Sequence, residues 1–139
     1  MLTDQGIIQG KAHETLRYRS MLRSKVKIFA DVAVKHATLL AETDLATIAE
    51  DTFYRGLADA MIVTGVGTGK QANLGHLQQV KDAVPQARVF VGSGVTADTI
   101  VGLLQYADGA IVGTCFKRDG MITNEVDENH VRDLIKARA

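Results

Sequence analysis

Two apolar runs that both end in glycine lie between Arg88 and Thr114, and the chain between them has helical character. Runs without polar alternation, here V-F-V and A-I-V, are typical of strands covered on both faces in a parallel sheet. Glycines at the ends of such strands lie on the side where α/β proteins bind ligands. The stretch therefore predicts a strand, a tight turn, a helix of about three turns and a second strand, with a ligand site beside the turns.

The residues that follow these two strands are suited to binding an oxyanion. Glycine permits left-handed backbone or a close approach, and we expect Thr96 to cap the following helix. Free N–H groups and the positive end of that helix would face a phosphate or a carboxylate. The predicted phosphate ligands are Gly92, Ser93, Gly94, Gly113 and Thr114. The alternative that these glycines only form short turns stays open, because a single G-x-G motif is weak.

The remaining elements follow from periodicity and capping residues. Asp44 is suited to cap a helix and Gly56 to close it, whereas residues 1–10 are expected to form a loop. Helices are predicted over residues 11–22, 45–55, 74–83 and 127–137, and strands over residues 26–34 and 58–64. The face of the last helix that we expect to be buried carries Val131, Leu134 and Ile135.

A weak internal repeat relates residues 57–65 (L-A-D-A-M-I-V-T-G) to residues 106–114 (Y-A-D-G-A-I-V-G-T). An Ala-Asp pair precedes each strand, and we interpret Asp59 and Asp108 as structural. One leading helix and four β-α units predict an α/β fold, a parallel half-barrel of the TIM type, as a single domain over residues 1–139. Four strands taken from a barrel leave two open edges and an apolar inner face. We therefore expect a homo-oligomer or association with a missing half.

Composition excludes several functions. The 139 residues carry 16 basic and 16 acidic side chains without a basic tract, so nothing indicates nucleic-acid binding. No apolar run is long enough to span a membrane and no signal peptide is evident, which indicates a cytoplasmic protein. The single Cys115 is expected to pack as a small buried residue. His13, His76 and His130 lack metal-ligand spacing, so neither a metal nor another cofactor is expected.

The segment A-D-V-A-V-K-H-A, at the end of the first predicted strand, carries the best catalytic candidates. Asp31 shares strand parity with Lys27 and Phe29, so Asp31 would lie near the mouth if that face lines a barrel. Lys35 and His36 fall in the following loop. A carboxylate, an ammonium and an imidazole could act there as general base, anion clamp and acid–base group. In the alternative, Lys27 and Asp31 form a buried ion pair and His36 packs in the loop.

The glycine-rich segment over residues 65–73 is a further candidate. Gly65, Thr68 and Gly69 lie in a long loop that could close over a ligand, and Lys70 could reach an anion. A solvated loop without a ligand is an equally good interpretation.

Five segments together resemble the BtpA/SgcQ family. They are T-D-Q-G-I-I-Q-G-K-A-H-E at 3–14, K-I-F-A-D-V-A-V-K-H-A at 27–37, G-L-A-D-A-M-I-V-T-G at 56–65, V-G-S-G-V-T at 91–96 and A-D-G-A-I-V-G-T at 107–114. The motifs occur in the right order over nearly the whole chain. The resemblance implies a (β/α)8 barrel roughly twice as long, of which this chain corresponds to the C-terminal half.

Two functions from different classes remain open, one implied by the resemblance and one indicated by the predicted anion site. The family name refers to photosystem I biogenesis, which implies a non-catalytic assembly factor, and other members are similar to proteins encoded beside sugar-uptake and sugar-metabolism genes. The predicted anion site instead suits a protein that binds a phosphorylated small metabolite, such as an isomerase, aldolase or epimerase of a sugar phosphate. Fold alone does not decide between them, so whether the chain is an enzyme stays open.

Overall fold

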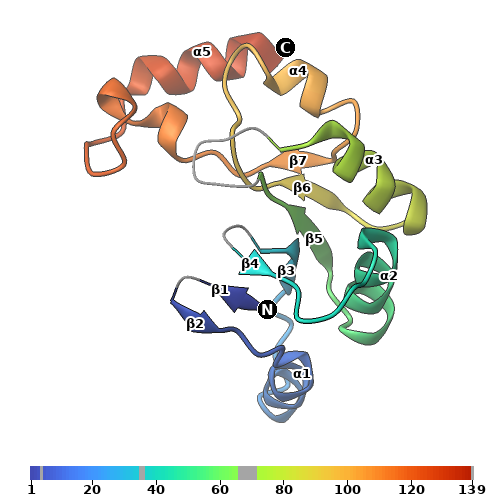
Figure 1. Ribbon diagram of the computed structural model, residues 1–139. Helices are drawn as coiled ribbons and strands as arrows, with labels where there is room; N and C mark the ends of the chain where they lie inside the picture. Colours follow the sequence, from blue (N-terminus) through green and yellow to red (C-terminus); the bar gives the residue numbers. More distant parts are fainter. Residues whose placement is uncertain (4, 35–36, 66–71, 139) are drawn as a thin grey trace.

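The main sheet consists of four parallel strands in sequence order. The computed structural model describes residues 1–3, 5–34, 37–65 and 72–138. The strands are β3 (Phe29–Ala33), β5 (Ala60–Val63), β6 (Val89–Val91) and β7 (Gly109–Ala110), arranged β3-β5-β6-β7 (Figure 1). In the register, Ile62 lies opposite Asp31 on one side and opposite Phe90 on the other. The predicted parallel sheet is therefore confirmed.

The helices that follow the strands cover the outer side of this sheet (Figure 1). Helix α1 precedes β3, and one helix follows each strand in turn (Figure 1). The bounds are α1 Ala12–Met21, α2 Leu45–Glu50, α3 Leu74–Ala83, α4 Ile100–Leu103 and α5 Glu128–Arg138. Because the strand order never reverses, right-handed crossovers place the connecting helices on the same face. A doubly wound sheet would reverse its order and carry helices on both faces, so this topology is that of a parallel half-barrel.

The core lies between the outer face of the sheet and the helices. Alternate side chains of β5 and β6 point into it, because successive side chains of a strand face opposite sides. Its largest fully buried members are Met61, Leu77, Leu103, Val32, Val80, Val84, Val89 and Val91. From α5 only Leu134 is buried, and Ile135 is 60% exposed. The prediction that Ile135 belongs to the buried face is therefore wrong.

The other face of the sheet, which we call the inner face, carries Phe29, Ile62, Phe90 and Ile111. Phe29 and Ile111 are each 48% exposed. The rings of Phe29 and Phe90 contact each other, with 5.1 Å between their centroids. The half-barrel thus leaves an apolar inner face partly open, as its topology requires.

Three short strands form a second sheet that the sequence did not predict. The strands β1 (Leu2–Thr3), β2 (Gly6–Ile7) and β4 (Ala37–Thr38) pair in antiparallel order β2-β1-β4. The prediction of a loop over residues 1–10 is therefore wrong in part. A strand of two residues has no measurable alternation, which is why the sequence pattern missed it.

Capping residues fix the starts of α2 and α3. Asp44 accepts a hydrogen bond from the Thr47 N–H at 2.9 Å, as predicted, and the bond from the Thr47 hydroxyl lowers the pKa of Asp44. The predicted helix over residues 45–55 is present as α2 followed by a π-helical turn, Asp51–Arg55. Asn73 caps α3 by accepting from the Gly75 N–H at 2.8 Å. Local side-chain chemistry therefore sets these boundaries.

The helix after β6 differs from its prediction. We expected about three turns with Thr96 as the cap, but α4 has only 4 residues, Ile100–Leu103, and Thr99 precedes it. The Thr96 N–H donates to the Thr99 hydroxyl at 2.9 Å, and Thr99 makes no side-chain hydrogen bond that caps α4. Threonine competes for backbone groups and Gly102 weakens a helix, which explains the short element.

The repeated aspartates hold neighbouring strands together. The Asp59 carboxylate accepts from the Ile28 N–H at 2.9 Å and from the Lys27 ammonium at 2.8 Å, just before β3. The Asp108 carboxylate accepts from the Val89 N–H at 2.8 Å, at the start of β6. Both lie at the amino ends of the strands, in agreement with a structural role. Lys27 is 72% exposed and pairs with Asp59, so the alternative of a buried ion pair with Asp31 is wrong.

Candidate functional site

The predicted phosphate ligands line one cavity. This cavity has a volume of about 320 Å³ and lies where β6 and β7 end. Its lining consists of residues 92–96, residues 111–115 and Gly120. The two glycine-containing segments, about 20 positions apart in the sequence, thus meet because parallel neighbours bring their carboxyl ends to one edge.

Glycine is favoured at three positions of this cavity. Gly94 and Gly120 have φ values of +72° and +65°, a backbone conformation that residues with side chains rarely adopt. A Cβ atom on Gly92 would lie 2.6 Å from the Thr64 Cγ2 and 2.7 Å from the Ile62 Cγ2. A Cβ atom on Gly113 would meet nothing within 4 Å, so no steric contact demands glycine there.

The lining of this cavity combines backbone N–H groups with the hydroxyl groups of Ser93, Thr96 and Thr114. Among the described residues, none accepts a hydrogen bond from the N–H of Gly94, Gly113 or Thr114. The described residues that line the cavity include no lysine or arginine. Helix α4 is too short to provide the helix dipole that the sequence predicted, so an anion here would depend on individual N–H donors.

Ser93 has a role that the sequence did not reveal. Its side chain is buried, and its hydroxyl oxygen accepts a hydrogen bond from the Gly65 N–H at 2.7 Å. Gly65 follows β5, so this bond ties the end of β5 to the turn after β6. No local sequence signal marks such a pair, because the partners are 28 positions apart.

A Ser93→Ala variant tests this tie. Loss of the hydroxyl leaves the Gly65 N–H without its acceptor, so we expect the free energy of unfolding to fall by about 1 kcal/mol. Urea denaturation of both proteins measures the difference. A Ser24→Ala variant is the control, because the Ser24 hydroxyl bonds only the exposed Val26 N–H at 3.2 Å. Equal stability losses in the two variants would contradict a tie at Ser93.

Of the three predicted catalytic residues, the structure places one. Asp31 lies in β3, and its side chain is exposed. A shift in the β3–β5 register follows directly after it, between Asp31 and Ala33. Irregularities of this kind re-aim side chains and are frequent beside functional sites. Lys35 and His36 lie outside the described residues, as do Thr68 and Gly69 of the predicted loop, whereas Gly65 is described and buried.

Asp31 and the glycine cavity lie on different strands. Two strand spacings, about 10 Å, separate β3 from β6. Asp31 is level with Phe90, which is two residues before Gly92 and hence about 7 Å lower along the strand. Asp31 therefore cannot contact a group bound at Gly92. One small molecule can, however, contact Asp31 at one end and the glycine cavity at the other.

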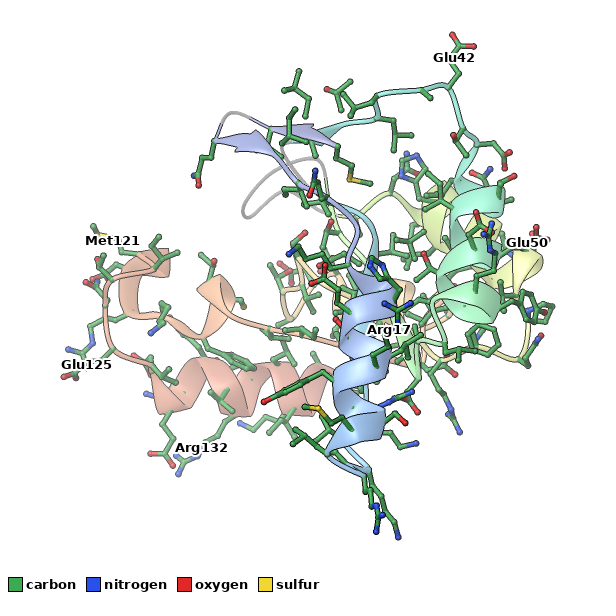
Figure 2. All side chains as sticks on the ribbon, turned by 90° about the horizontal axis from the view of Figure 1, so that it is seen from below. Arg17, Glu42, Glu50, Met121, Glu125 and Arg132 are labelled. Atoms are coloured by element: carbon green, nitrogen blue, oxygen red, sulfur yellow. The ribbon has the colours of Figure 1, made fainter. Side chains whose placement is uncertain are left out.

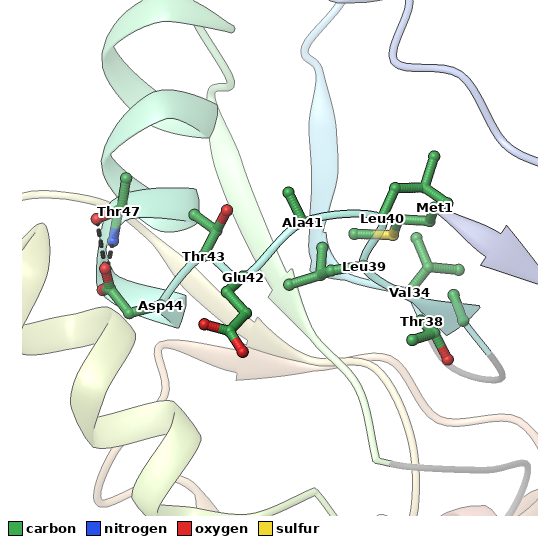
Figure 3. Close-up of a pocket in the computed structure, with 11 residues that line it drawn as sticks. Met1, Val34, Thr38, Leu39, Leu40, Ala41, Glu42, Thr43, Asp44 and Thr47 are labelled. Atoms are coloured by element: carbon green, nitrogen blue, oxygen red, sulfur yellow. Dashed lines mark hydrogen bonds between the residues drawn. The ribbon is translucent and has the colours of Figure 1, made fainter.

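A larger hollow lies beside the loop after β3. Its volume is about 1060 Å³, and its lining includes Leu39, Leu40, Glu42 and Asp44 (Figure 3). Figure 3 shows that the Asp44 carboxylate is engaged by Thr47 as a helix cap. Among the described residues of this lining, Glu42 is the one carboxylate without a capping role, and they form no convergent set of reactive groups.

Two features, a metal-binding cluster and a membrane-spanning helix, are not found among the described residues. No group of three or more His, Cys, Asp or Glu side chains could hold a metal ion within that part of the chain. Likewise, no helix in the described ranges is long and apolar enough to cross a bilayer.

Cys115 is only partly buried beside the glycine cavity, so the expectation of a buried residue is met in part.

Comparisons with known proteins identify relatives along the entire chain. A Synechocystis protein named photosystem I biogenesis protein BtpA is 47% identical over 139 residues, which are 100% of this chain and 48% of that protein. An uncharacterised protein of Thermococcus kodakarensis is 46% identical, over 96% of this chain and 50% of its own length. The Escherichia coli sgc region protein SgcQ is 29% identical, again over 96% and 50%. The chain thus spans about half the length of these relatives.

Among solved structures, the YdjI aldolase of Escherichia coli K12 is similar with a TM-score of 0.47 and 18% sequence identity. The alignment covers 91% of this chain and 48% of the aldolase. A model of the BtpA family matches residues 1–139. With this match and the identities above, the chain belongs to the BtpA family.

Proposed function

We propose that this chain binds the phosphate group of a small phosphorylated metabolite, of the sugar phosphate type, where β6 and β7 end. One observation carries the proposal: the cavity of about 320 Å³ is lined by both glycine segments. Its N–H groups at Gly94, Gly113 and Thr114 have no acceptor among the described residues. Several N–H groups that converge on one point form a nest that suits an oxyanion.

The proposal gives Asp31 a role at the other end of the metabolite. Its carboxylate would act as a general base or as a hydrogen-bond acceptor for a sugar hydroxyl. Lys35 and His36, which follow closely in the sequence, would supply an anion clamp and an acid–base group. Under this proposal, Asp31→Asn abolishes turnover of a sugar phosphate but leaves phosphate affinity unchanged.

A titration tests the anion site. Inorganic phosphate and a set of sugar phosphates are added to ¹⁵N-labelled protein, and backbone amide shifts are followed residue by residue. We expect saturable shifts centred on Gly92–Gly94 and on Gly113–Thr114. Shifts scattered over lysine-rich surfaces, without saturation at these segments, would contradict the proposal. The amides of α3, away from the cavity, serve as the internal control.

A second candidate function is a non-catalytic assembly factor. The Synechocystis relative, 47% identical over the whole matched chain, is named for photosystem I biogenesis, which favours this alternative. Such a factor would present a partner-binding surface on its outer helices. Asp31→Asn would leave partner binding intact, whereas it would abolish turnover in an enzyme. Measuring both properties in one variant separates the two functions.

The open half-barrel adds a proposal about association. Two free sheet edges and an apolar inner face favour either a second copy or a complementary half as the partner. Residues from that partner would complete the mouth in which the metabolite lies.

A further inference from the structure

We propose that Lys117 supplies the positive charge for the phosphate group that binds in the glycine cavity. This inference rests on the proposed function and deepens it, because it names the residue that neutralises the ligand. A phosphate ester carries a charge of about −1.5 to −2 near neutral pH. The N–H and hydroxyl groups of the described lining donate hydrogen bonds but carry no net charge, so a nearby ammonium group would add the counter-charge.

Lys117 is a partly buried lysine in the loop after β7. Among the described residues, no carboxylate pairs with its ammonium group, and no acceptor receives a hydrogen bond from it. Other cations in this part of the chain are already paired, Lys81 with Asp108 and Arg132 with Glu128. The charge of Lys117 is therefore available to a bound anion.

The backbone of Lys117 is hydrogen-bonded to the lining of the cavity on both sides. Its N–H donates to the Thr114 carbonyl at 3.0 Å, and its carbonyl accepts from the Gly120 N–H at 3.1 Å. Thr114 and Gly120 both line the cavity. Turns of this kind hold Cα atoms three residues apart within about 7 Å of each other. Lys117 is therefore a close neighbour of the lining, although its own side chain is not part of it.

The length of the side chain is sufficient for contact with a bound phosphate. Five bonds of about 1.5 Å join the Cα of a lysine to its Nζ, which gives an extended side chain of about 6 Å. The stem is flexible, and the ammonium group can donate in three directions. The Lys117 ammonium can therefore reach an oxyanion that accepts hydrogen bonds from Gly113 and Thr114.

A hairpin fixes the position of Lys117. The residue forms an antiparallel bridge with Val126, and the N–H of the next residue, Arg118, donates to the Glu125 carbonyl at 3.0 Å. Figure 2 shows Met121 and Glu125 of this hairpin at the outer edge of the molecule. The base of the hairpin, where Lys117 lies, is the part that adjoins the cavity.

The test titrates inorganic phosphate into ¹⁵N-labelled wild type and three variants at low ionic strength, where charges are least screened. The amides of Gly92–Gly94 and Gly113 report the dissociation constant. We expect Lys117→Gln to weaken binding about tenfold, because a charge-assisted hydrogen bond is lost. Lys117→Arg should stay within about threefold of the wild type, since a guanidinium group also binds phosphate. Arg118→Gln is the matched control, because it removes the same charge from an exposed neighbour, and it should leave binding unchanged.

A second measurement needs no variant. Acetic anhydride modifies accessible lysines, and mass spectrometry of the peptides gives the rate at each position. We expect saturating phosphate to slow the acetylation of Lys117 severalfold. The rate at Lys136, which is exposed on α5, should not change.

The outcomes separate this inference from the proposed function. If the wild type shows no saturable shifts at the two glycine segments, the phosphate site itself is refuted, and the role of Lys117 with it. If the wild type binds phosphate but Lys117→Gln binds it equally well, only the role of Lys117 is overturned. Urea denaturation checks that Lys117→Gln folds as the wild type does. If it is less stable, the acetylation of the wild type decides, and a rate at Lys117 that phosphate does not alter overturns the inference.

Discussion

Gly92→Ala is expected to abolish saturable phosphate binding and to lower the free energy of unfolding by about 1 to 3 kcal/mol. The new methyl group would lie 2.6 Å from the Thr64 Cγ2 and 2.7 Å from the Ile62 Cγ2, so these side chains or the turn after β6 must shift. A shift of that turn alters the lining of the cavity and lengthens the hydrogen bond between Ser93 and Gly65. Amide titration and urea denaturation measure the two effects.

Two other glycines provide controls for Gly92. Gly102 lies in α4, and a Cβ atom there would meet nothing within 4 Å, so Gly102→Ala should leave binding unchanged and stabilise the protein by up to about 1 kcal/mol. Gly113 lines the cavity, but a Cβ atom there meets nothing. Gly113→Ala should therefore cause no measurable stability loss. It should weaken phosphate binding, because the new methyl group would lie at the cavity. If Gly92→Ala binds phosphate as the wild type does, the cavity is not the anion site.

The sequence predicted elements well where a local signal defined them. Helix α3 was expected over residues 74–83 and spans Leu74–Ala83, because Asn73 can cap it and Pro85 cannot continue it. The start of α2 follows in the same way from Asp44. The phosphate candidates gather at one cavity because neighbouring parallel strands end at the same edge, which is a consequence of topology.

Features that depend on distant partners could not be predicted. The two-residue strand β1 exists through its pairing with β2 and β4, and its own sequence has no strand pattern. Ile135 has helical spacing with Val131, but which apolar side chain is buried depends on where α5 meets α4. The role of Ser93 depends on Gly65, from another strand end. Periodicity carries no information about such contacts.

Asp59→Ala is expected to lower the free energy of unfolding by about 2 to 3 kcal/mol near neutral pH. The Asp59 carboxylate joins three groups: the Ile28 N–H, the Lys27 ammonium and the Arg19 guanidinium, the last at 3.0 Å. Removing it leaves an N–H at the start of β3 without an acceptor and two cations without a counter-charge. Because β3 is an edge strand of the main sheet, its amino end should fray, which hydrogen exchange at Ile28 would detect.

The pH dependence of this variant provides a second measurement. The hydrogen bond from Lys27, followed by that from the Ile28 N–H, lowers the pKa of Asp59 to about 2. An unfolded aspartate has a pKa of about 3.9, so the stability from Asp59 is complete above that pH and is lost as the pH falls towards 2. Between these limits the unfolding free energy of the wild type should fall more steeply than that of Asp59→Ala.

Asp51→Ala is the matched control for the Asp59 variant. Asp51 pairs with Arg55 at 3.4 Å, but both side chains are exposed, by 56% and 81%. Exposed pairs contribute little, so we expect a change of less than about 0.5 kcal/mol. Asp108 should behave as Asp59 does. Burial raises the pKa of Asp108, but the hydrogen bonds from Lys81 and from the Val89 N–H lower it by more, so its pKa lies below the usual value. A stability loss at Asp59 no larger than at Asp51 would contradict the idea that the repeated aspartates fasten the strands.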